Sequence, residues 1–167
     1  MPLKKSISNI AWNFKDTEKI FKLLVKNNFE YIEVAPLEIF DDWDNLNYNK
    51  SHMFMSMVKN YGLKICSLQS IFYNSGLNIH ENFKESVNHF KKVEEVCHLL
   101  DCDYVVFGSP KTRNFPEDKS LEYKNKKMEQ FFEEAKSIFN KKIGLEANPA
   151  VYKTNFCNGY DEVADFV

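Results

Sequence analysis

Glu146 is the residue of this sequence best placed to carry out chemistry. It lies in the segment Ile143–Pro149, where a short apolar strand ends in one carboxylate and a proline prevents the strand from continuing. In proteins of alternating strands and helices, ligands and catalytic groups gather at the carboxyl ends of parallel strands. If the chain catalyses a reaction, we therefore expect Glu146 to take part. A strand-end glutamate that is simply solvated is the alternative.

Arg113 is the second residue that stands out by its type. The chain has 22 basic residues, and Arg113 is the single arginine among 21 lysines. A planar guanidinium binds phosphate or carboxylate groups with two hydrogen bonds, which a lysine ammonium does not do. The Lys-rich and Asn-rich composition itself is more plausibly a coding bias of the genome than a functional signal.

The composition is that of one globular domain with a sizeable core. The 167 residues are 44% hydrophobic and 15% aromatic, and 22 basic and 24 acidic residues in mixed order give a net charge of -2. Such a charge pattern favours neither a nucleic-acid partner nor a membrane partner. No apolar run approaches the ~20 residues that span a bilayer, and no signal peptide is recognisable, so we expect a cytoplasmic protein.

The four cysteines do not have the spacing of a metal site or a redox motif. They contain no Cys-x-x-Cys pair and have no histidine at zinc-finger distance, so reduced and mostly buried thiols are expected. The four histidines fall on predicted helices or in a loop, which makes them surface or structural residues. The cysteines are at positions 66, 97, 102 and 157, and the histidines at 52, 80, 89 and 98.

Strands and helices are predicted to alternate along the whole chain. Short β-branched and apolar runs indicate strands, and apolar residues at steps of three and four indicate the helices between them. The predicted strands are Ser6–Trp12, Tyr31–Ala35, Lys64–Ser70, Tyr104–Gly108 and Ile143–Glu146. The predicted helices begin near Asp16, with that side chain as N-cap, and near Ser51, Glu81, Ser120 and Asp161, and Gly62 is the expected end of the second.

This alternation predicts an α/β protein with a parallel sheet and right-handed crossovers. No Gly-rich phosphate-binding loop follows any strand, which disfavours a nucleotide-binding fold and favours a barrel of eight strand–helix units. Such a barrel takes ~250 residues, so the fold class expected here is a partial (β/α)8 TIM barrel with about five strands and four complete helices. We expect a truncated barrel; a complete, open five-stranded sheet is the alternative.

Three motifs resemble the xylose isomerase-like TIM barrel superfamily, most closely bacterial sugar phosphate isomerases/epimerases. They are Phe29–Val34, Phe107–Arg113, and Gly144–Pro149 followed by Tyr152–Phe156. The resemblance runs the full chain and makes residues 1–167 the N-terminal part of a single barrel domain. Members hold a divalent metal ion at the strand ends, and the first ligand maps onto Glu146. The other ligands, an Asp, a His and a second Glu, would fall beyond Val167.

The activity implied by this resemblance is metal-assisted proton transfer next to a sugar carbonyl. A bound Mn²⁺, Mg²⁺, Co²⁺ or Zn²⁺ polarises the carbonyl, a carboxylate such as Glu146 removes a neighbouring proton, and an enediolate is reprotonated to an epimer or isomer. Because most of the metal site is missing from this chain, the chain itself is expected to be inactive, possibly without any metal. The sugar, its phosphorylation and the choice of metal stay open.

Seven further positions are candidates for contacting the sugar or sugar phosphate. Lys111 and Arg113 could hold a phosphate or carboxylate, with an exposed pair of loop cations as the alternative. Asn148 and Tyr152 could order the loop after Glu146 or contact sugar hydroxyls. Gln69 could bind a hydroxyl, and Trp12 and Cys66 could form apolar pocket wall, although core packing is the alternative for both.

Three other functions remain as alternatives. A decayed barrel could bind a sugar without turnover, or a half-barrel could form a homo-oligomer through its exposed sheet edges. The superfamily also contains apurinic endonucleases, which need metal-binding histidines at the third and fourth strand ends. Those ends read Leu68-Gln-Ser70 and Phe107-Gly-Ser109 here, without histidine, so a nuclease is disfavoured.

Overall fold

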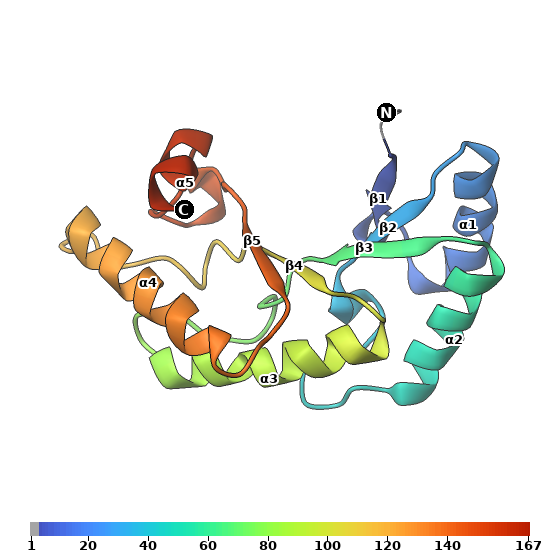
Figure 1. Ribbon diagram of the computed structural model, residues 1–167, viewed down its shortest axis with the longest axis horizontal. Helices are drawn as coiled ribbons and strands as arrows, with labels where there is room; N and C mark the ends of the chain where they lie inside the picture. The colour runs from blue at the N-terminus through green and yellow to red at the C-terminus, as the bar shows by residue number, and fades with distance from the viewer. Residues whose placement is uncertain (1–3) are drawn as a thin grey trace.

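The computed structural model describes residues 4–167 as five parallel strands, each followed by a helix (Figure 1). The sheet order is β1-β2-β3-β4-β5, so every strand pairs with its neighbours in sequence. The strands are β1 (Ser6–Ser8), β2 (Tyr31–Val34), β3 (Lys64–Leu68), β4 (Tyr104–Phe107) and β5 (Lys142–Leu145). The α-helices are α1 (Thr17–Lys26), α2 (Tyr48–Asn60), α3 (Phe83–Leu99), α4 (Leu121–Lys136) and α5 (Tyr160–Phe166).

The helices cover one face of a curved sheet. In Figure 1, α1 to α4 follow one another around the outer side of the strands, and the opposite face of the sheet is open. All pairings between the strands are parallel, so the carboxyl ends of all five strands lie along the same edge. This arrangement confirms the predicted fold class, an α/β protein forming about five strands of a barrel.

The first strand is shorter than predicted. The prediction extended to Trp12, but β1 ends at Ser8 and residues Asn9–Ala11 form a 3-10 turn, η1. The buried Asn9 side chain explains the difference: its Oδ1 accepts from the backbone N–H of Ala35 at 2.7 Å, and its Nδ2 donates to the Ala35 carbonyl at 3.3 Å. Asn9 thus takes over the pairing with the end of the second strand, and the backbone is free to turn.

One predicted cap contact and one predicted helix start are also corrected. Helix α1 begins at Thr17, directly after Asp16 as predicted, but the Asp16 side chain accepts no hydrogen bond from the described first turn. Helix α2 begins at Tyr48 rather than near Ser51, because Asn47 Oδ1 accepts from the Lys50 N–H at 3.0 Å and acts as the N-cap. The predicted helix end at Gly62 is confirmed by its φ of 66°, which a glycine adopts without strain.

Aromatic packing between the sheet and the helices forms the centre of the core. Phe107 on β4 contacts Phe72, Phe131 and Phe132, with ring centroids 5.4 to 5.7 Å apart. Phe90 on α3 packs against Phe131 on α4 at 5.7 Å. Fully burying each such ring stabilises the fold by about 1.5–3 kcal/mol. The core therefore fixes β4, whose carboxyl end carries the site described below.

The opposite face of the sheet carries polar side chains. Ser67 on β3 donates to the Glu33 carboxylate on β2 at 2.8 Å, and these two residues are paired in the strand register. Ile32 and Val34, which flank Glu33, are fully buried on the helix side. Glu33 therefore lies in a polar layer on the inner face of the sheet.

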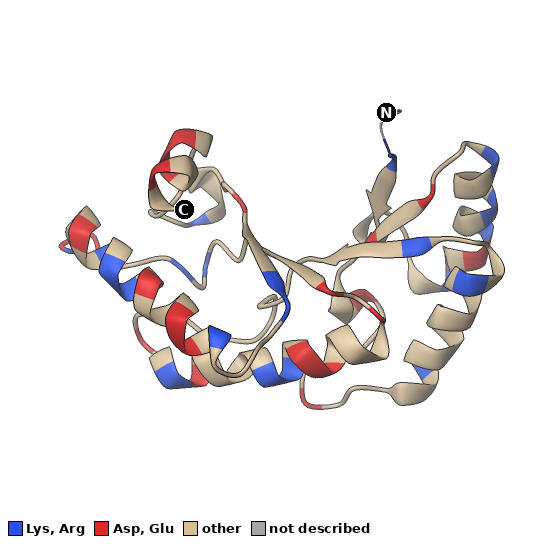
Figure 2. Ribbon diagram, in the orientation of Figure 1, with Lys and Arg blue, Asp and Glu red and all other residues tan. Residues whose placement is uncertain are grey.

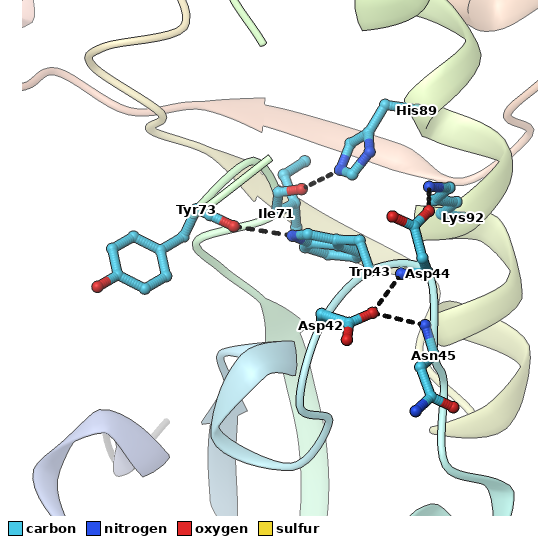
Figure 3. Close-up of polar contacts among 8 residues, drawn as sticks. All are labelled: Asp42, Trp43, Asp44, Asn45, Ile71, Tyr73, His89 and Lys92. Carbon is cyan, nitrogen blue, oxygen red and sulfur yellow. Dashed lines mark hydrogen bonds and ion pairs between the residues drawn. The ribbon is translucent and has the colours of Figure 1, made fainter. Parts of the chain in front are cut away.

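His89 on α3 is a buried structural residue that holds the loop after β3 (Figure 3). Its Nε2 lies 2.8 Å from the Ile71 carbonyl, and its ring packs between Trp43 and Phe72 with centroids 4.6 and 4.5 Å away. Trp43 Nε1 donates to the Tyr73 carbonyl at 2.8 Å. Burial, the largest influence, lowers the pKa of His89 below its ordinary value.

Among residues 4–167, no helix has the length and apolar character needed to cross a bilayer.

The buried imidazole makes stability depend on pH. Because burial lowers the pKa of His89 in the folded state, the unfolded chain binds the proton more readily, and the free energy of unfolding should fall as the pH drops below about 6.5. One proton limits the slope to about 1.4 kcal/mol per pH unit. Urea unfolding between pH 8 and pH 5 measures it.

The matched control is the exposed His52 on α2. We expect His52→Gln to retain the pH slope and His89→Gln to reduce it, at the cost of a lower stability at every pH. An unchanged slope in His89→Gln would assign the pH dependence to other groups.

Candidate functional site

Glu146 lies directly after β5 with an exposed side chain. Its backbone N–H donates to the Phe107 carbonyl at 3.2 Å, which continues the pairing of β5 with β4 by one residue. Its carboxylate Oε2 accepts a hydrogen bond from Asn148 Nδ2 at 3.1 Å. The structure therefore brings together two of the predicted site residues, Glu146 and Asn148, at the carboxyl edge of the sheet.

Gly108 provides the space that this carboxylate occupies. A Cβ atom at Gly108 would stand 2.3 Å from Glu146 Oε2 and 3.3 Å from Asn148 Oδ1. Any larger residue at position 108 would collide with the carboxylate as it stands. A glycine is needed at this position of the motif Phe107–Arg113 because the Glu146 side chain approaches the backbone closely.

Arg113 lies beneath the loop that carries Glu146. Its side chain is completely buried, and Nη2 donates at 2.8 Å to both the Glu146 carbonyl and Asn148 Oδ1. Its Nε and Nη1 atoms are buried without a hydrogen-bond partner among the described residues. Burial, the dominant influence, lowers the pKa of Arg113 below its usual value. The alternative of an exposed loop cation is therefore wrong for Arg113, whose observed contacts are with the Glu146 loop.

A cleft of about 940 Å³ opens between the loops that follow β3, β4 and β5, and Glu146, Asn148 and Arg113 are not among its lining residues. Two predicted substrate-binding residues line it, Lys111 and Tyr152, and both are exposed. Tyr73 and Lys153 also line the cleft and were not predicted. Both follow a strand end within a loop, which is the signal that could have found them. The cleft has the size typical of a small-molecule site.

Lys111 and Lys153 are the charged residues among those lining the cleft, so its described wall is basic. Figure 2 shows basic and acidic residues interspersed along α1, α3 and α4. A basic wall at a strand-end cleft suits an anionic or strongly polar ligand.

The three remaining candidates do not line this cleft. Gln69 Nε2 donates to Ser8 Oγ and so connects the ends of β3 and β1. Trp12 Nε1 donates to Thr17 Oγ1 at 3.2 Å, and its ring meets Phe21 edge-on at 6.2 Å. Cys66 Sγ, within β3, lies 3.3 Å from the Ile32 carbonyl. For Trp12 and Cys66 these contacts fit the alternative reading, core packing, rather than a pocket wall.

A second cleft of about 470 Å³ lies between the loop after β2 and helix α3. Its wall includes Asp42, Asp44 and Lys92, shown in Figure 3. Asp42 Oδ1 accepts from the backbone N–H groups of Asp44 and Asn45, and Lys92 pairs with Asp44. These charges find partners within the loop or on α3, and none of the predicted site residues lines this cleft.

The described residues do not assemble a metal site. Within residues 4–167, no three His, Cys, Asp or Glu side chains lie close enough together to hold a metal ion. Glu146 offers one carboxylate at the strand ends, whereas divalent cations in proteins need several ligands. The described residues therefore supply one strand-end carboxylate, Glu146, toward the metal that the sequence resemblance implied.

No model of a known protein family matches the sequence. No curated protein matches it either.

Solved structures do share the fold. A sugar phosphate isomerase/epimerase from Parabacteroides distasonis aligns with a TM-score of 0.64 and 18% identity, over 87% of this chain and 51% of that one. A xylose isomerase domain protein from Alicyclobacillus acidocaldarius aligns at 0.62 and 12% identity, over 99% and 58%. A family 2 AP endonuclease from Brucella melitensis aligns at 0.63 and 14% identity, over 90% and 57%.

These similarities confirm the predicted resemblance at the level of the fold. The chain has the architecture of part of a TIM barrel and spans between half and three fifths of the lengths of these three structures. At such low identity the likeness establishes the fold alone. The same fold serves a sugar phosphate isomerase/epimerase and an endonuclease, so the function has to be argued from the site.

The space at Gly108 generates a testable prediction. In Gly108→Ala the added methyl group should displace the Glu146 carboxylate and break its hydrogen bond with Asn148. Because the displaced atom is the free end of a flexible side chain, we expect the free energy of unfolding to change by less than about 1 kcal/mol. Nuclear magnetic resonance (NMR) signals of the Asn148 side-chain amide report the lost contact, and urea unfolding reports stability.

Gly159→Ala is the matched control, because no described atom lies within 4 Å of the position that its Cβ would take. It should leave the Asn148 amide signals unchanged. An Asn148 signal in Gly108→Ala that is identical to that of the unmodified chain would show that the carboxylate does not occupy this space in solution.

Proposed function

We propose that this chain carries the N-terminal part of a sugar or sugar phosphate isomerase/epimerase site, with Glu146 as one acid–base carboxylate and metal ligand. The observation that supports this most directly is the hydrogen-bonded carboxylate at the end of β5. It is backed by Gly108 and bound by Asn148, and the residues that follow Gly108 line the basic cleft. The fold likeness to a sugar phosphate isomerase/epimerase makes this chemistry more plausible by analogy.

The proposed chemistry is a proton transfer at carbon. The Glu146 carboxylate takes a proton from the carbon next to a sugar carbonyl, and the electron pair of the broken C–H bond moves into an enediolate. Returning a proton to the opposite face of the same carbon gives an epimer, and returning it to the neighbouring carbon gives an aldose or ketose isomer. A divalent metal, when bound, would stabilise the negative charge of the enediolate.

Substrate binding is assigned to the cleft between the strand-end loops. Lys111 would pair with a phosphate or another anionic group, and Tyr152 would contact hydroxyl groups. Asn148 does not line the cleft, and its bonds to Arg113 and Glu146 favour its other predicted role, ordering the loop after Glu146. Gln69, at the neighbouring strand end, is retained as a candidate for a hydroxyl contact. The exposure of Lys111 and Tyr152 supports this assignment, because both are open to a ligand from solvent.

The chain by itself is proposed to turn over no sugar. A proton returned to the opposite face requires a second acid, and the metal requires further ligands. Within residues 4–167 no metal-binding cluster is formed. A second acid–base group and the remaining ligands would have to come from polypeptide outside this chain.

Two alternatives use the same structure. The chain could bind sugars without turnover, or associate through the edges of its sheet, since β1 and β5 each have one neighbouring strand among the described residues. A nuclease shares the fold. It is disfavoured by the net charge of -2 and by Gln69 and Gly108, which stand at strand ends where that class needs histidines.

Sugar binding can be measured without turnover. Saturation-transfer NMR with ketoses and ketose phosphates should detect binding to the chain, and Lys111→Met should weaken binding of the phosphates by about tenfold, the equivalent of about 1.4 kcal/mol. Lys142→Met is the matched control, because Lys142 begins β5 at the opposite edge of the sheet. Equal losses in the two variants, or no binding of any ketose, would contradict the assignment of the cleft.

Inactivity is tested separately in D₂O. With added Mn²⁺, Mg²⁺, Co²⁺ or Zn²⁺, the purified chain should neither convert a ketose to its epimer or isomer nor incorporate deuterium next to the carbonyl. Metal-dependent conversion that disappears in Glu146→Gln would overturn the proposed inactivity while supporting the role of Glu146. Reading the coding sequence beyond codon 167 for strand-end Asp, His and Glu residues distinguishes the enzyme from a binding remnant.

The open strands give a prediction about association. Because β1 and β5 expose backbone N–H and C=O groups along one side each, we expect the chain to form oligomers whose fraction rises with concentration. Light scattering coupled to size-exclusion chromatography measures their mass. A monomer with cooperative thermal unfolding at every concentration would show that these edges are not used.

A further inference from the structure

The side-chain amide of Asn148 lies between two groups of opposite hydrogen-bonding character. Its Oδ1 accepts from Arg113 Nη2 at 2.8 Å, and its Nδ2 donates to Glu146 Oε2 at 3.1 Å. A guanidinium offers only donors, and an ionised carboxylate offers only acceptors. Turning the amide by 180° would therefore break both bonds and place two oxygen atoms against each other at Glu146. The contacts allow one orientation of the amide.

We propose that Arg113 is a positioning residue: it fixes the orientation of Asn148, and Asn148 in turn fixes one oxygen of the Glu146 carboxylate. The proposal rests on the proposed function only in calling Glu146 an acid–base group. Oε2 is held by Asn148 and backed by Gly108. Oε1 of the exposed Glu146 side chain has no hydrogen-bond partner among residues 4–167, which assigns the proton transfer to Oε1.

An arginine suits this role for a geometric reason. One nitrogen, Nη2, carries two hydrogen atoms in the plane of the guanidinium, and it reaches both the Glu146 carbonyl and Asn148 Oδ1 at 2.8 Å. The same group thus anchors the backbone and the amide of one loop together. A lysine ammonium is a more strongly hydrated point charge without a planar array of donors, and it is harder to bury. This explains the single arginine in a chain that otherwise uses lysine.

A separate contact joins the same two loops and allows the role of positioning to be distinguished from simple loop docking. Asn155 Oδ1 accepts from the Phe115 N–H at 3.0 Å, and its Nδ2 donates to the Phe115 carbonyl at 2.8 Å. No recorded hydrogen bond joins Asn155 to Asn148 or Glu146. Removing the Asn155 side chain should therefore loosen the loops without releasing the Asn148 amide.

The test follows the Asn148 side-chain amide by ¹H–¹⁵N NMR in the full 167-residue chain. In the unmodified protein, the amide proton that is hydrogen-bonded to Glu146 Oε2 should exchange slowly with solvent. Arg113→Met should speed this exchange. Asn155→Ala should lower the melting temperature and retain the slow exchange.

A double-variant cycle tests that Arg113 acts through Asn148. Arg113→Met alone should move the ¹³C signal of the Glu146 carboxyl carbon at constant pH, and it should cause no further movement in the Asn148→Ala background. If Arg113→Met does not fold, Asn148→Asp keeps Arg113 in place and removes the donor to Glu146, so the same ¹³C signal should move.

Several outcomes would overturn the proposal. They are an Asn148 amide that still exchanges slowly in Arg113→Met, an equally fast exchange in Asn155→Ala, and additive effects in the double variant. In Asn148→Asp, an unmoved Glu146 signal would do the same. None of these measurements uses a sugar. A chain that binds no ketose but shows the expected amide behaviour would therefore refute the proposed function and leave the positioning role of Arg113 intact.

Discussion

The arrangement at the carboxyl edge of the sheet depends on the burial of one positive charge. Arg113 is completely removed from solvent, and its described hydrogen bonds go to a backbone carbonyl and a side-chain amide of the neighbouring loop. Burying a charge without a directly bonded carboxylate costs several kcal/mol. The surrounding packing has to offset this cost, so the loops after β4 and β5 cannot separate without exposing both the guanidinium and the groups that it holds. The same buried charge therefore holds the loop backbone and the Asn148 side chain that contacts the Glu146 carboxylate.

The carboxyl edge of the sheet is held in place by packing on both faces of the strands, which differ in their side chains. On the helix side, Val105 and Phe107 of β4 are fully buried in an aromatic core. Because side chains alternate along a strand, this burial turns Tyr104 and Val106 to the inner face, and Gly144 of β5 accommodates the Tyr104 hydroxyl. A Cβ at Gly144 would stand 1.9 Å from that oxygen. Both glycines near the site, Gly108 and Gly144, thus make room for a side chain of the adjacent strand.

Periodicity in the sequence was enough to predict the elements, but not the contacts between them. The strand and helix order, the parallel sheet and the position of Glu146 follow from local patterns, and the structure confirms the first two and places Glu146 directly after β5. The end of β1 was wrong because it is set by Asn9, whose partner Ala35 lies 26 residues away. The burial of Arg113 depends on Glu146 and Asn148, 33 and 35 residues away. Without those partners, an arginine in a loop with an asparagine and a proline nearby is expected to be exposed.

The loop after β5 is held mainly by amide side chains, and this has a consequence for the site. Asn158 Nδ2 donates to the carbonyls of Asn148 and Thr154 at 3.0 and 3.1 Å, and Asn155 pairs with both backbone groups of Phe115. Amides do not titrate, whereas a loop held by carboxylates or histidines would change its contacts when the pH crossed their pKa values. The asparagines, which in the sequence looked like a compositional bias, therefore hold this loop through hydrogen bonds that do not titrate.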